Sequence, residues 1–248
     1  EIAAYHWTGP ISNYNNETQV LNYQLSDLDD INTENPEVRD VLRESYGYWI
    51  KEVGVDGYRI DTVKYVPHEF WNNFHWVEDK EYPGIMHVAE ELGKDDFITF
   101  GEAWIGSKPY KSEADKKIAE YLGTEEKPEM PSVLNFTLNR DIRDVFAGGK
   151  PTSQLSYRMK SIYEHYPEPG RLFTFIDNHD MDRFMALSSY EDMRLALLYL
   201  FTVPGVPVVY YGTEQQFTET RQAMFANGFA SGGEYHFLTE IYHPVAGF

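Results

Sequence analysis

Three acidic residues each follow a short apolar run of strand length. Asp61 follows residues 55–60, Glu102 follows residues 97–101, and Asp180 closes a polar segment that begins after Ile176. Alpha/beta folds gather their functional groups at the carboxyl ends of parallel strands, so we expect these three carboxylates to share a site. Glycoside hydrolysis needs one carboxyl group as proton donor and one carboxylate as nucleophile or base. Metal-assisted hydrolysis could also use three carboxylates.

The residues beside two of these acids favour different protonation states. Arg59 lies two residues before Asp61, so both side chains project from the same face of a strand, and the cation keeps the carboxylate ionised. Glu102 lies two residues before Trp104, and a partly desolvated site there would raise the pKa of Glu102, as a general acid requires. Taken singly, a structural Arg–Asp pair and a buried, backbone-bonded glutamate explain these residues equally well.

The polar segment of residues 177–180 has its own alternative. Asp and Asn favour turns, so the run Asp-Asn-His-Asp could be a turn with no chemical role. Four consecutive polar residues after an apolar strand are nevertheless costly to place unless they face a cleft. In that case Asp180 is the third carboxylate and His179 is a hydrogen-bond donor.

Other common catalytic signatures are absent from the sequence. It has no His-Glu-x-x-His or paired-histidine spacing for a transition metal, and no Gly-x-Ser-x-Gly elbow of the serine hydrolases. Cysteine is absent, which excludes disulfides, thiolate metal sites and a cysteine nucleophile.

Strands and helices alternate along the chain and would position these residues. A helix begins after the N-cap Asn35, with Pro36 at its first position, and Gly54 ends it, whereas residues 1–32 read as irregular. Strand-like runs end near Ile60, Gly101, Phe136, Ile176 and Tyr210, and helical patterns cover residues 70–77, 85–92, 114–122, 142–146, 155–163 and 193–201. This alternation predicts parallel strands with helical crossovers. Five strands fit an open doubly wound sheet, because a closed barrel needs eight, although dinucleotide and phosphate-loop fingerprints are missing.

Composition narrows the possible partners. The 248 residues carry 21 Lys and Arg against 40 Asp and Glu, a net charge of −19, so nucleic acid is not an expected partner. No apolar run approaches the ~20 residues of a membrane span, and no secretory signal is visible at the N-terminus. Aromatic residues make up 16%, and some could serve as platforms for sugar rings.

Five motifs, in order along the chain, resemble the α-amylase family of glycoside hydrolases, which includes the cyclodextrin glucanotransferases. They are Leu-Ser-Asp-Leu-Asp at residues 25–29, Gly-Val-Asp-Gly-Tyr-Arg-Ile-Asp-Thr-Val-Lys at 54–64, Phe-Gly-Glu-Ala-Trp at 100–104, Phe-Ile-Asp-Asn-His-Asp at 175–180 and Gly-Val-Pro-Val-Val-Tyr-Tyr-Gly-Thr-Glu at 205–214. The resemblance implies a (β/α)8 TIM barrel, of which this chain would hold strands four to eight. Residues 1–26 would end an inserted second domain, and residues 27–248 would form the C-terminal part of the catalytic barrel. The family's early Asp and Asn-His motif is absent from the chain.

The resemblance also implies roles for individual residues. Asp61 would be the nucleophile, Glu102 the general acid/base and Asp180 the transition-state stabiliser of a retaining enzyme that cleaves α-1,4-glucosidic bonds in starch or maltooligosaccharides. The substrate-binding residues would be Arg59, Lys64, Tyr65, Trp104 and His179. A transglycosylase of the same family, or a carbohydrate-binding scaffold without catalysis, are the alternatives.

A calcium site is the cofactor that the resemblance implies. Its ligands in this chain would be Asp27 and the backbone carbonyl of Tyr65, which stands where the family often has histidine. We expect an extracellular or periplasmic location and an α-glucan partner.

Overall fold

The computed structural model describes residues 4–224, which form two compact units. Unit 1 comprises residues 1–105 and 116–134, and unit 2 comprises residues 106–115 and 135–248. The boundary falls within helix α5 (Glu113–Ala119). Residues 1–3 and 225–248 of the two expected domains lie outside the described part of the chain.

Unit 1 begins with a small lobe that is more regular than the sequence predicts. Strand β1 (Tyr5–His6) pairs antiparallel with β2 (Asp30–Ile31), and helix α1 (Glu17–Asn22) lies between them in the sequence. The prediction of an irregular segment over residues 1–32 is therefore wrong in this part. The Asn16 side chain accepts a hydrogen bond from the Gln19 amide, so it is the N-cap of this short helix.

The predicted helix after Asn35 is confirmed at both ends. Helix α2 (Pro36–Tyr48) has Asn35 as its N-cap, with the side chain accepting a hydrogen bond from the Glu37 amide. The helix continues as the π-helical turn η2 (Trp49–Val53) and ends at Gly54 in the left-handed region, with φ 77°. Glycine adopts this conformation without a steric penalty, which explains where the helix stops.

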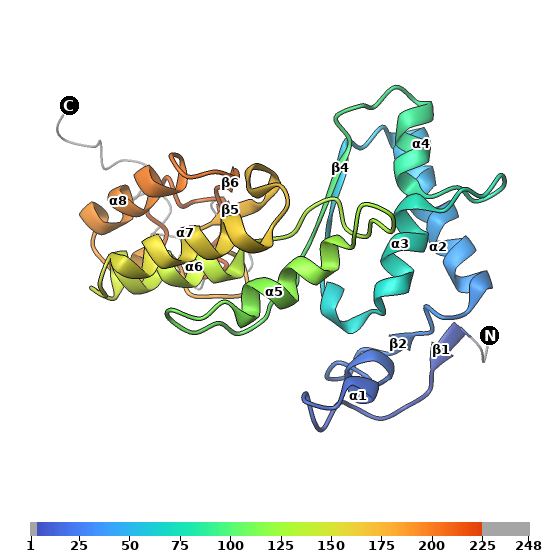
Figure 1. Ribbon diagram of the computed structural model, residues 1–248, viewed down its shortest axis with the longest axis horizontal. Helices are drawn as coiled ribbons and strands as arrows, with labels where there is room; N and C mark the ends of the chain where they lie inside the picture. Colours follow the sequence, from blue (N-terminus) through green and yellow to red (C-terminus); the bar gives the residue numbers. More distant parts are fainter. Residues whose placement is uncertain (1–3, 225–248) are drawn as a thin grey trace. The chain divides into compact units, whose positions relative to one another are not determined.

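Two parallel strands form the sheet of unit 1. Strand β3 (Gly57–Ile60) pairs with β4 (Ile98–Gly101) so that Ile60 lies opposite Gly101. The turn η3 (Val63–Tyr65) and helices α3 (His68–Trp76) and α4 (Ile85–Glu91) connect them, and Figure 1 shows these helices with α2 beside the strands. A Cβ atom at Gly57 would collide with the Ile98 carbonyl oxygen, so the close approach of the strands requires glycine there.

The run that the sequence predicts as a strand ending near Phe136 forms only one bridge to β4. Within unit 1, the Gly101 amide donates to the Ser132 carbonyl and the Leu134 amide to the Gly101 carbonyl, both at 2.9 Å. Helix α6 (Phe136–Ile142) then begins, with the buried Asn135 as its N-cap. The predicted strand is therefore present only as a single parallel bridge, because the N-cap of α6 ends the extended run.

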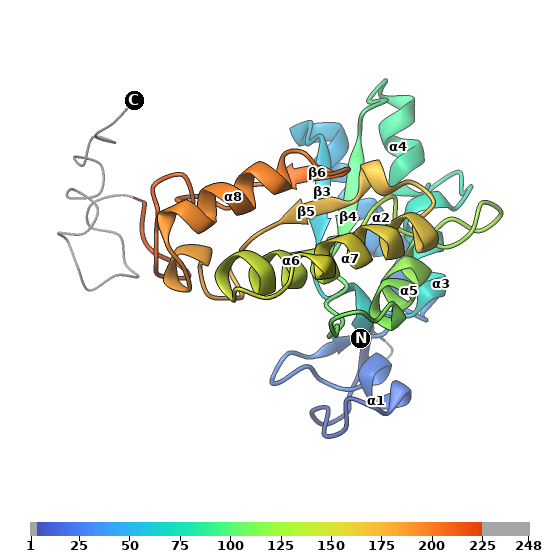
Figure 2. The same cartoon turned by 60° about the vertical axis from the view of Figure 1, so that its left-hand side comes forward.

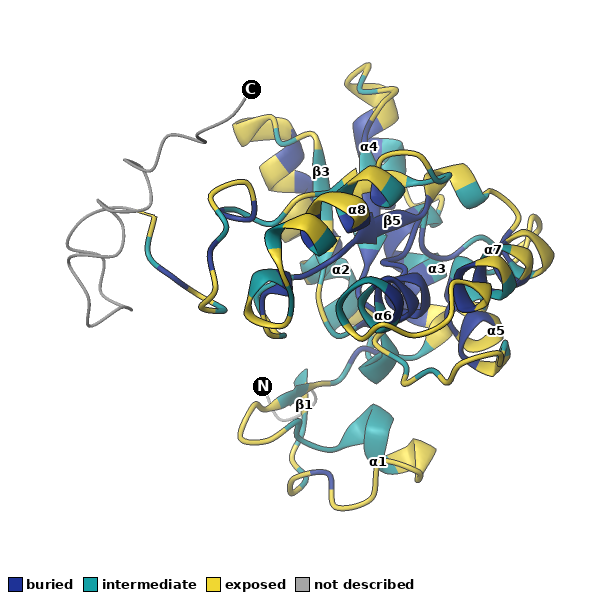
Figure 3. Ribbon diagram, turned by 90° about the vertical axis from the view of Figure 1, so that its left-hand side faces the viewer, coloured by how far each residue is buried: buried dark blue, intermediate teal, exposed yellow. Residues whose placement is uncertain are grey.

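Unit 2 contains a second parallel pair, β5 (Phe173–Phe175) and β6 (Val206–Val208). Helices α6 and α7 (Ser153–His165) pack on each other, and α6 also contacts β5 (Figure 2). Figure 3 shows α6 and β5 as its most buried elements. Helix α8 (Tyr190–Leu200) starts with a capping box at Ser189. Short helical turns make up the rest: η4 (Glu120–Leu122) in unit 1, and η5 (Arg143–Ala147), η6 (Pro169–Arg171) and η7 (Phe184–Ala186) in unit 2.

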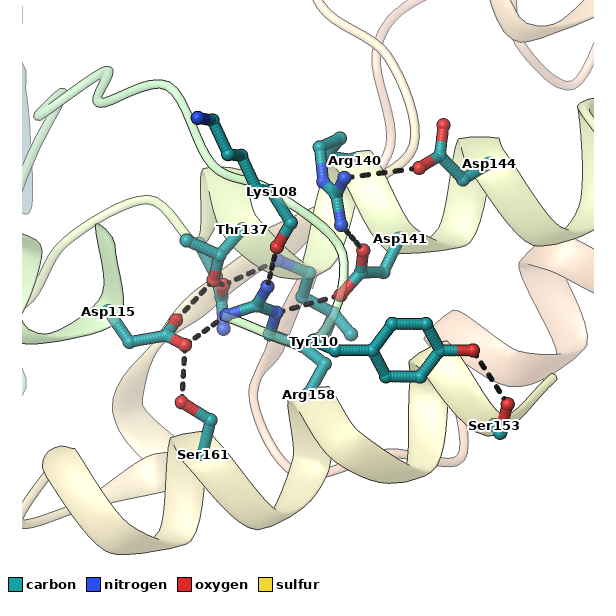
Figure 4. Close-up of polar contacts among 12 residues, drawn as sticks. Lys108, Tyr110, Asp115, Thr137, Arg140, Asp141, Asp144, Ser153, Arg158 and Ser161 are labelled. Atoms are coloured by element: carbon teal, nitrogen blue, oxygen red, sulfur yellow. Dashed lines mark hydrogen bonds and ion pairs between the residues drawn. The ribbon is translucent and has the colours of Figure 1, made fainter. Parts of the chain in front are cut away.

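A buried ion cluster holds unit 2 together (Figure 4). The Arg158 side chain is fully buried; its Nε donates to Asp141 at 2.8 Å and its Nη1 contacts Asp115. The hydroxyls of Thr137 and Ser161 also donate to Asp115. Removing one partner of such a cluster costs about 3–5 kcal/mol, so Arg158 fixes the segment of residues 106–115 to α6 and α7.

Among the helices of residues 4–224, none combines the length and the apolar character needed to cross a bilayer.

A buried histidine joins α3 to β4 in unit 1. His75 is completely buried; its Nδ1 lies 2.9 Å from the Trp71 carbonyl oxygen and its Nε2 lies 2.8 Å from the Thr99 hydroxyl. A carbonyl only accepts, so Nδ1 carries the proton and Nε2 accepts from Thr99. Burial lowers the pKa of His75 to about 4 and the Trp71 hydrogen bond only partly opposes this, so the folded protein holds a neutral ring.

This burial predicts a loss of stability in weak acid. The unfolded chain binds a proton at His75 below its ordinary pKa of 6.5, whereas the folded protein does not until about pH 4, so stability falls as the pH drops through that window. We expect His75 to account for roughly 2 kcal/mol of the free energy of unfolding lost between pH 7 and pH 5. Urea unfolding of the wild type and of His75→Gln at both pH values measures this, because the glutamine does not titrate. Equal losses in the two proteins would contradict the prediction.

Candidate active site

One arginine contacts two of the predicted carboxylates in unit 1. Arg59 Nη1 lies 3.3 Å from Asp61 Oδ2, and Arg59 Nη2 forms an ion pair with Glu102 Oε2. The predicted contact between Arg59 and Asp61 is confirmed. The contact with Glu102 requires the pairing of β3 with β4, which places Ile60 opposite Gly101 and so brings the following residues of both strands together.

The two carboxylates have different surroundings. The Asp61 side chain is 57% exposed, whereas that of Glu102 is 8% exposed. The sequence predicts a desolvated glutamate beside Trp104, and the burial of Glu102 agrees with this. The carboxylate is nevertheless ion-paired with Arg59 instead of lying in a purely apolar setting, because the strand register brings Arg59 to it.

Three more predicted residues surround this acidic pair. The Lys64 ammonium donates to the Trp104 carbonyl oxygen at 2.8 Å and lies 5.0 Å from the centre of the Tyr65 ring. Burial lowers the pKa of Lys64, although the nearby Glu102 carboxylate opposes this, and burial raises the pKa of the Tyr65 hydroxyl. Trp104 is 39% exposed. Lys64, Tyr65 and Trp104 therefore belong to one cluster with Glu102.

A pocket of about 460 Å³ borders Asp61 and Tyr65 within unit 1. Its wall is largely apolar and includes Leu28, Tyr58 and Trp71. Small-molecule sites have this character, with a few polar groups on a mostly apolar lining. Asp61 is therefore one of the polar residues on this lining, whereas Glu102 does not line the pocket.

The third predicted acid belongs to unit 2 and has a histidine and an arginine as neighbours. Asp180 Oδ2 lies 3.0 Å from His179 Nε2, and Asp180 Oδ1 lies 3.0 Å from Arg221 Nη2. Arg221 Nε also donates to the His179 carbonyl oxygen at 3.0 Å. The structure thus brings the two predicted residues His179 and Asp180 into contact. Arg221 was not predicted, because it lies 41 residues from Asp180 and no local pattern marks it.

Asp177 shows that part of the polar segment does form a structural turn. This side chain is buried and accepts hydrogen bonds from the Phe184 amide at 2.9 Å and from the Thr213 hydroxyl at 3.1 Å. Both bonds close the loop that carries His179 and Asp180. The turn interpretation is therefore correct for Asp177, whereas Asp180 remains a partly exposed acid paired with Arg221.

The predicted calcium ligands do not form a complete ion site by themselves. Asp27 lies in a tight turn in which the Leu28 amide donates to the Leu25 carbonyl, and Tyr65 lies in η3. Calcium takes about 6–8 oxygen ligands, and this chain offers two expected donors. Over residues 4–224, no three His, Asp or Glu side chains gather into a possible metal site.

Known proteins similar to this chain agree on one family. The family model described as "Alpha amylase, catalytic domain" matches residues 5–236. The cyclomaltodextrinase of Thermoanaerobacter pseudethanolicus is 30% identical over 187 residues, covering 73% of this chain and 28% of that protein. The cyclomaltodextrin glucanotransferase of Paenibacillus macerans is 34% identical over 196 residues, covering 78% of this chain and 24% of that protein. The chain thus spans about a quarter of the length of these relatives.

Solved structures give the same result. The structure of an Anoxybacillus α-amylase superposes with a TM-score of 0.71 at 31% identity, covering 87% of this chain and 44% of that chain. The α-amylase from Geobacillus thermoleovorans, complexed with acarbose, superposes with a TM-score of 0.71 at 26% identity. The match covers 97% of this chain and 50% of that chain. The α/β architecture, the matched catalytic-domain model and these identities establish that this chain belongs to the α-amylase family.

Proposed function

We propose that the chain carries the catalytic residues of a retaining glycoside hydrolase that cleaves α-1,4-glucosidic bonds in starch or maltooligosaccharides. The observation that supports this most is the contact of one guanidinium with both Asp61 and Glu102. A retaining mechanism needs two carboxyl groups about 5–5.5 Å apart, and a shared arginine brings the two close together. The crystallisation of a solved relative with acarbose supports a glucan-like ligand.

The two carboxylates have environments that suit different steps. The exposed Asp61 carboxylate attacks the anomeric carbon while Glu102 donates a proton to the glycosidic oxygen, and the bond between carbon and that oxygen breaks. Glu102 then removes a proton from water, which attacks the same carbon and releases Asp61. Arg59 counters the charge of Asp61 before and after the covalent intermediate.

The remaining residues fit supporting roles in this proposal. Asp180 and His179 stabilise the transition state and bind sugar hydroxyls; their support is their place at the carboxyl end of β5, equivalent to that of Asp61 after β3. Lys64, Tyr65 and Trp104 line the side of the leaving group; the support is that the Glu102 charge acts on Lys64 and Tyr65, and that Lys64 donates to the Trp104 carbonyl.

We further propose that the parallel strands belong to a (β/α)8 barrel as strands four to eight. Residues 1–26 then end an inserted domain and residues 27–248 form barrel. In the described residues β3 pairs only with β4, and β6 pairs only with β5, so each has a free edge. Parallel strands are normally paired and covered on both faces, which supports a larger sheet. This chain matches 44% of the length of one solved relative and 50% of another, which supports the same proposal.

A transglycosylase is the second candidate, favoured by the partly exposed Trp104, which follows Glu102 by two residues in the chain. An aromatic ring there stacks on an incoming sugar, whose hydroxyl replaces water in the second step. Product analysis with maltooligosaccharides separates the two activities: glucose and maltose indicate hydrolysis, whereas cyclic or longer products indicate transfer. A carbohydrate-binding scaffold without catalysis would give no turnover.

A leaving-group experiment tests the two central roles. Maltosyl fluoride needs little protonation, so Glu102→Gln should lose about 10²–10⁴-fold in activity on starch but keep glycosylation by the fluoride. Asp61→Ala should lose both activities, because no covalent intermediate forms. Azide should partly rescue Asp61→Ala and give the β-glycosyl azide, which nuclear magnetic resonance identifies.

Asp56→Asn is the matched control for these variants. It removes an acid on the amino-terminal side of β3, where Asp56 pairs with Lys94, so we expect kcat close to that of the wild type on both substrates. Turnover of the fluoride by Asp61→Ala without azide, together with its loss in Glu102→Gln, would reverse or refute the assignment.

A calcium ion bound by Asp27 and the Tyr65 carbonyl is also a proposal, with the other ligands supplied outside the described residues. Bound calcium stabilises the folded protein by about 3 kcal/mol at 100 times its Kd. Chelation should therefore lower the melting temperature of the complete protein, and Asp27→Asn should remove most of that response. An unchanged melting temperature after chelation would exclude the ion.

A further inference from the structure

The chain leaves regular strand geometry directly after Asp61. Thr62 has φ 52° and ψ 31°, in the left-handed region, between the end of β3 and the turn η3. Non-glycine residues seldom adopt this conformation, and for a β-branched side chain it is a genuine outlier. Strained residues of this kind persist only where the surrounding structure enforces them.

The hydrogen bonds around Thr62 show what the strained residue does. The Glu102 amide donates to the Ile60 carbonyl at 2.8 Å, as in a regular parallel pair. Continuation of that pattern would make Thr62 the next donor, to the Glu102 carbonyl. Instead the Val63 amide donates to it at 3.1 Å. Thr62 is thus an extra residue in the ladder, equivalent to a bulge, and bulges re-aim neighbouring side chains.

Val63 keeps this bulge in place. Its side chain is completely buried, and a Cβ at Gly101 would lie only 2.7 Å from Val63 Cγ2, so Val63 packs directly against β4. The Val63 carbonyl also accepts a hydrogen bond from the Trp71 indole at 3.2 Å. The turn therefore cannot relax the conformation of Thr62 without losing these contacts.

We propose that Thr62 is a positioning residue whose left-handed backbone aims the Asp61 carboxylate relative to Glu102. The main chain of Glu102 is bonded on both sides of the Asp61–Thr62 pair, through Ile60 and Val63. The Thr62 hydroxyl makes no hydrogen bond within the described residues, so the backbone conformation carries the effect. This inference rests on the proposed roles of Asp61 and Glu102, and it adds the residue that fixes their relative placement.

Substitutions that forbid or favour the left-handed conformation test the proposal in the complete protein. Proline cannot adopt a positive φ, so Thr62→Pro should lower kcat on maltosyl fluoride by about 100-fold with KM changed less than about threefold. Asparagine tolerates the conformation, so Thr62→Asn should lose less than about tenfold in kcat and should melt at a higher temperature than the wild type. Gln216→Asn relieves a similar residue, φ 62°, in unit 2 and should raise the melting temperature without changing kcat.

Amide hydrogen exchange gives a second readout that does not depend on the folding of Thr62→Pro. The Val63 amide should be protected in the wild type and in Thr62→Asn. Exchange of this amide at the rate of a free peptide in the wild type would overturn the proposal. Equal losses of kcat in Thr62→Asn and Thr62→Pro would also overturn it, because they would assign the effect to the threonine side chain. A folded Thr62→Pro with the kcat of the wild type would overturn it as well.

Failure of the proposed function is recognised separately. If Asp61→Ala turns over maltosyl fluoride as fast as the wild type, or the wild type does not turn it over, the catalytic assignment fails. If Asp61→Ala is inactive and Thr62→Pro retains wild-type kcat, only the positioning role fails.

Discussion

The register of β3 against β4 is the constraint on which the acidic pair of unit 1 depends. Ile60 lies opposite Gly101, so Asp61 and Glu102 are the next residues on neighbouring strands, and Arg59 reaches both carboxylates. A slip by one residue would turn every following side chain to the other face of the sheet. Gly57 and Gly101 protect this register, because a side chain at either position would meet the neighbouring strand or the turn after β3.

Burial divides the charged residues of the molecule into two kinds. Arg158, Asp115 and Asp141 are fully buried and satisfy one another, so they stabilise unit 2 and are closed to a ligand (Figure 4). Asp61 and Asp180 are charged groups that remain partly open to solvent. Desolvating an unpaired charge is costly, so the buried Glu102 needs its partner Arg59, whereas Asp61 and Asp180 keep part of their carboxylates open to a substrate.

Both units build their candidate residues in the same way. A short parallel strand ends, a loop follows, and hydrogen bonds from the neighbouring strand or helix hold the loop. In unit 1 the bonds join Glu102 to Ile60 and Val63, and in unit 2 Asp177 accepts from Phe184 and Thr213. These bonds use main-chain groups or the buried Asp177 side chain, and the side chains of Asp61, Glu102 and Asp180 take no part in them. The arrangement agrees with the family to which the chain belongs.

The sequence by itself determined the local elements and the chemical types of the candidate residues. The N-cap at Asn35, the stop at Gly54 and the strands before Asp61, Glu102 and Asp180 depend on neighbouring residues, so local pattern was enough to predict them. The spacing of Arg59 and Asp61 likewise follows from strand geometry. The family followed from motif order.

Only the tertiary structure decided which groups touch across the chain. The contacts of Arg59 with Glu102 and of Arg221 with Asp180 join residues 43 and 41 positions apart, and no periodicity encodes such distances. The N-terminal lobe was missed because its strands have two residues each and pair across a long loop. The left-handed conformation of Thr62 could not be predicted from the sequence for a related reason. Threonine disfavours that conformation, and only the packing of Val63 on β4 enforces it.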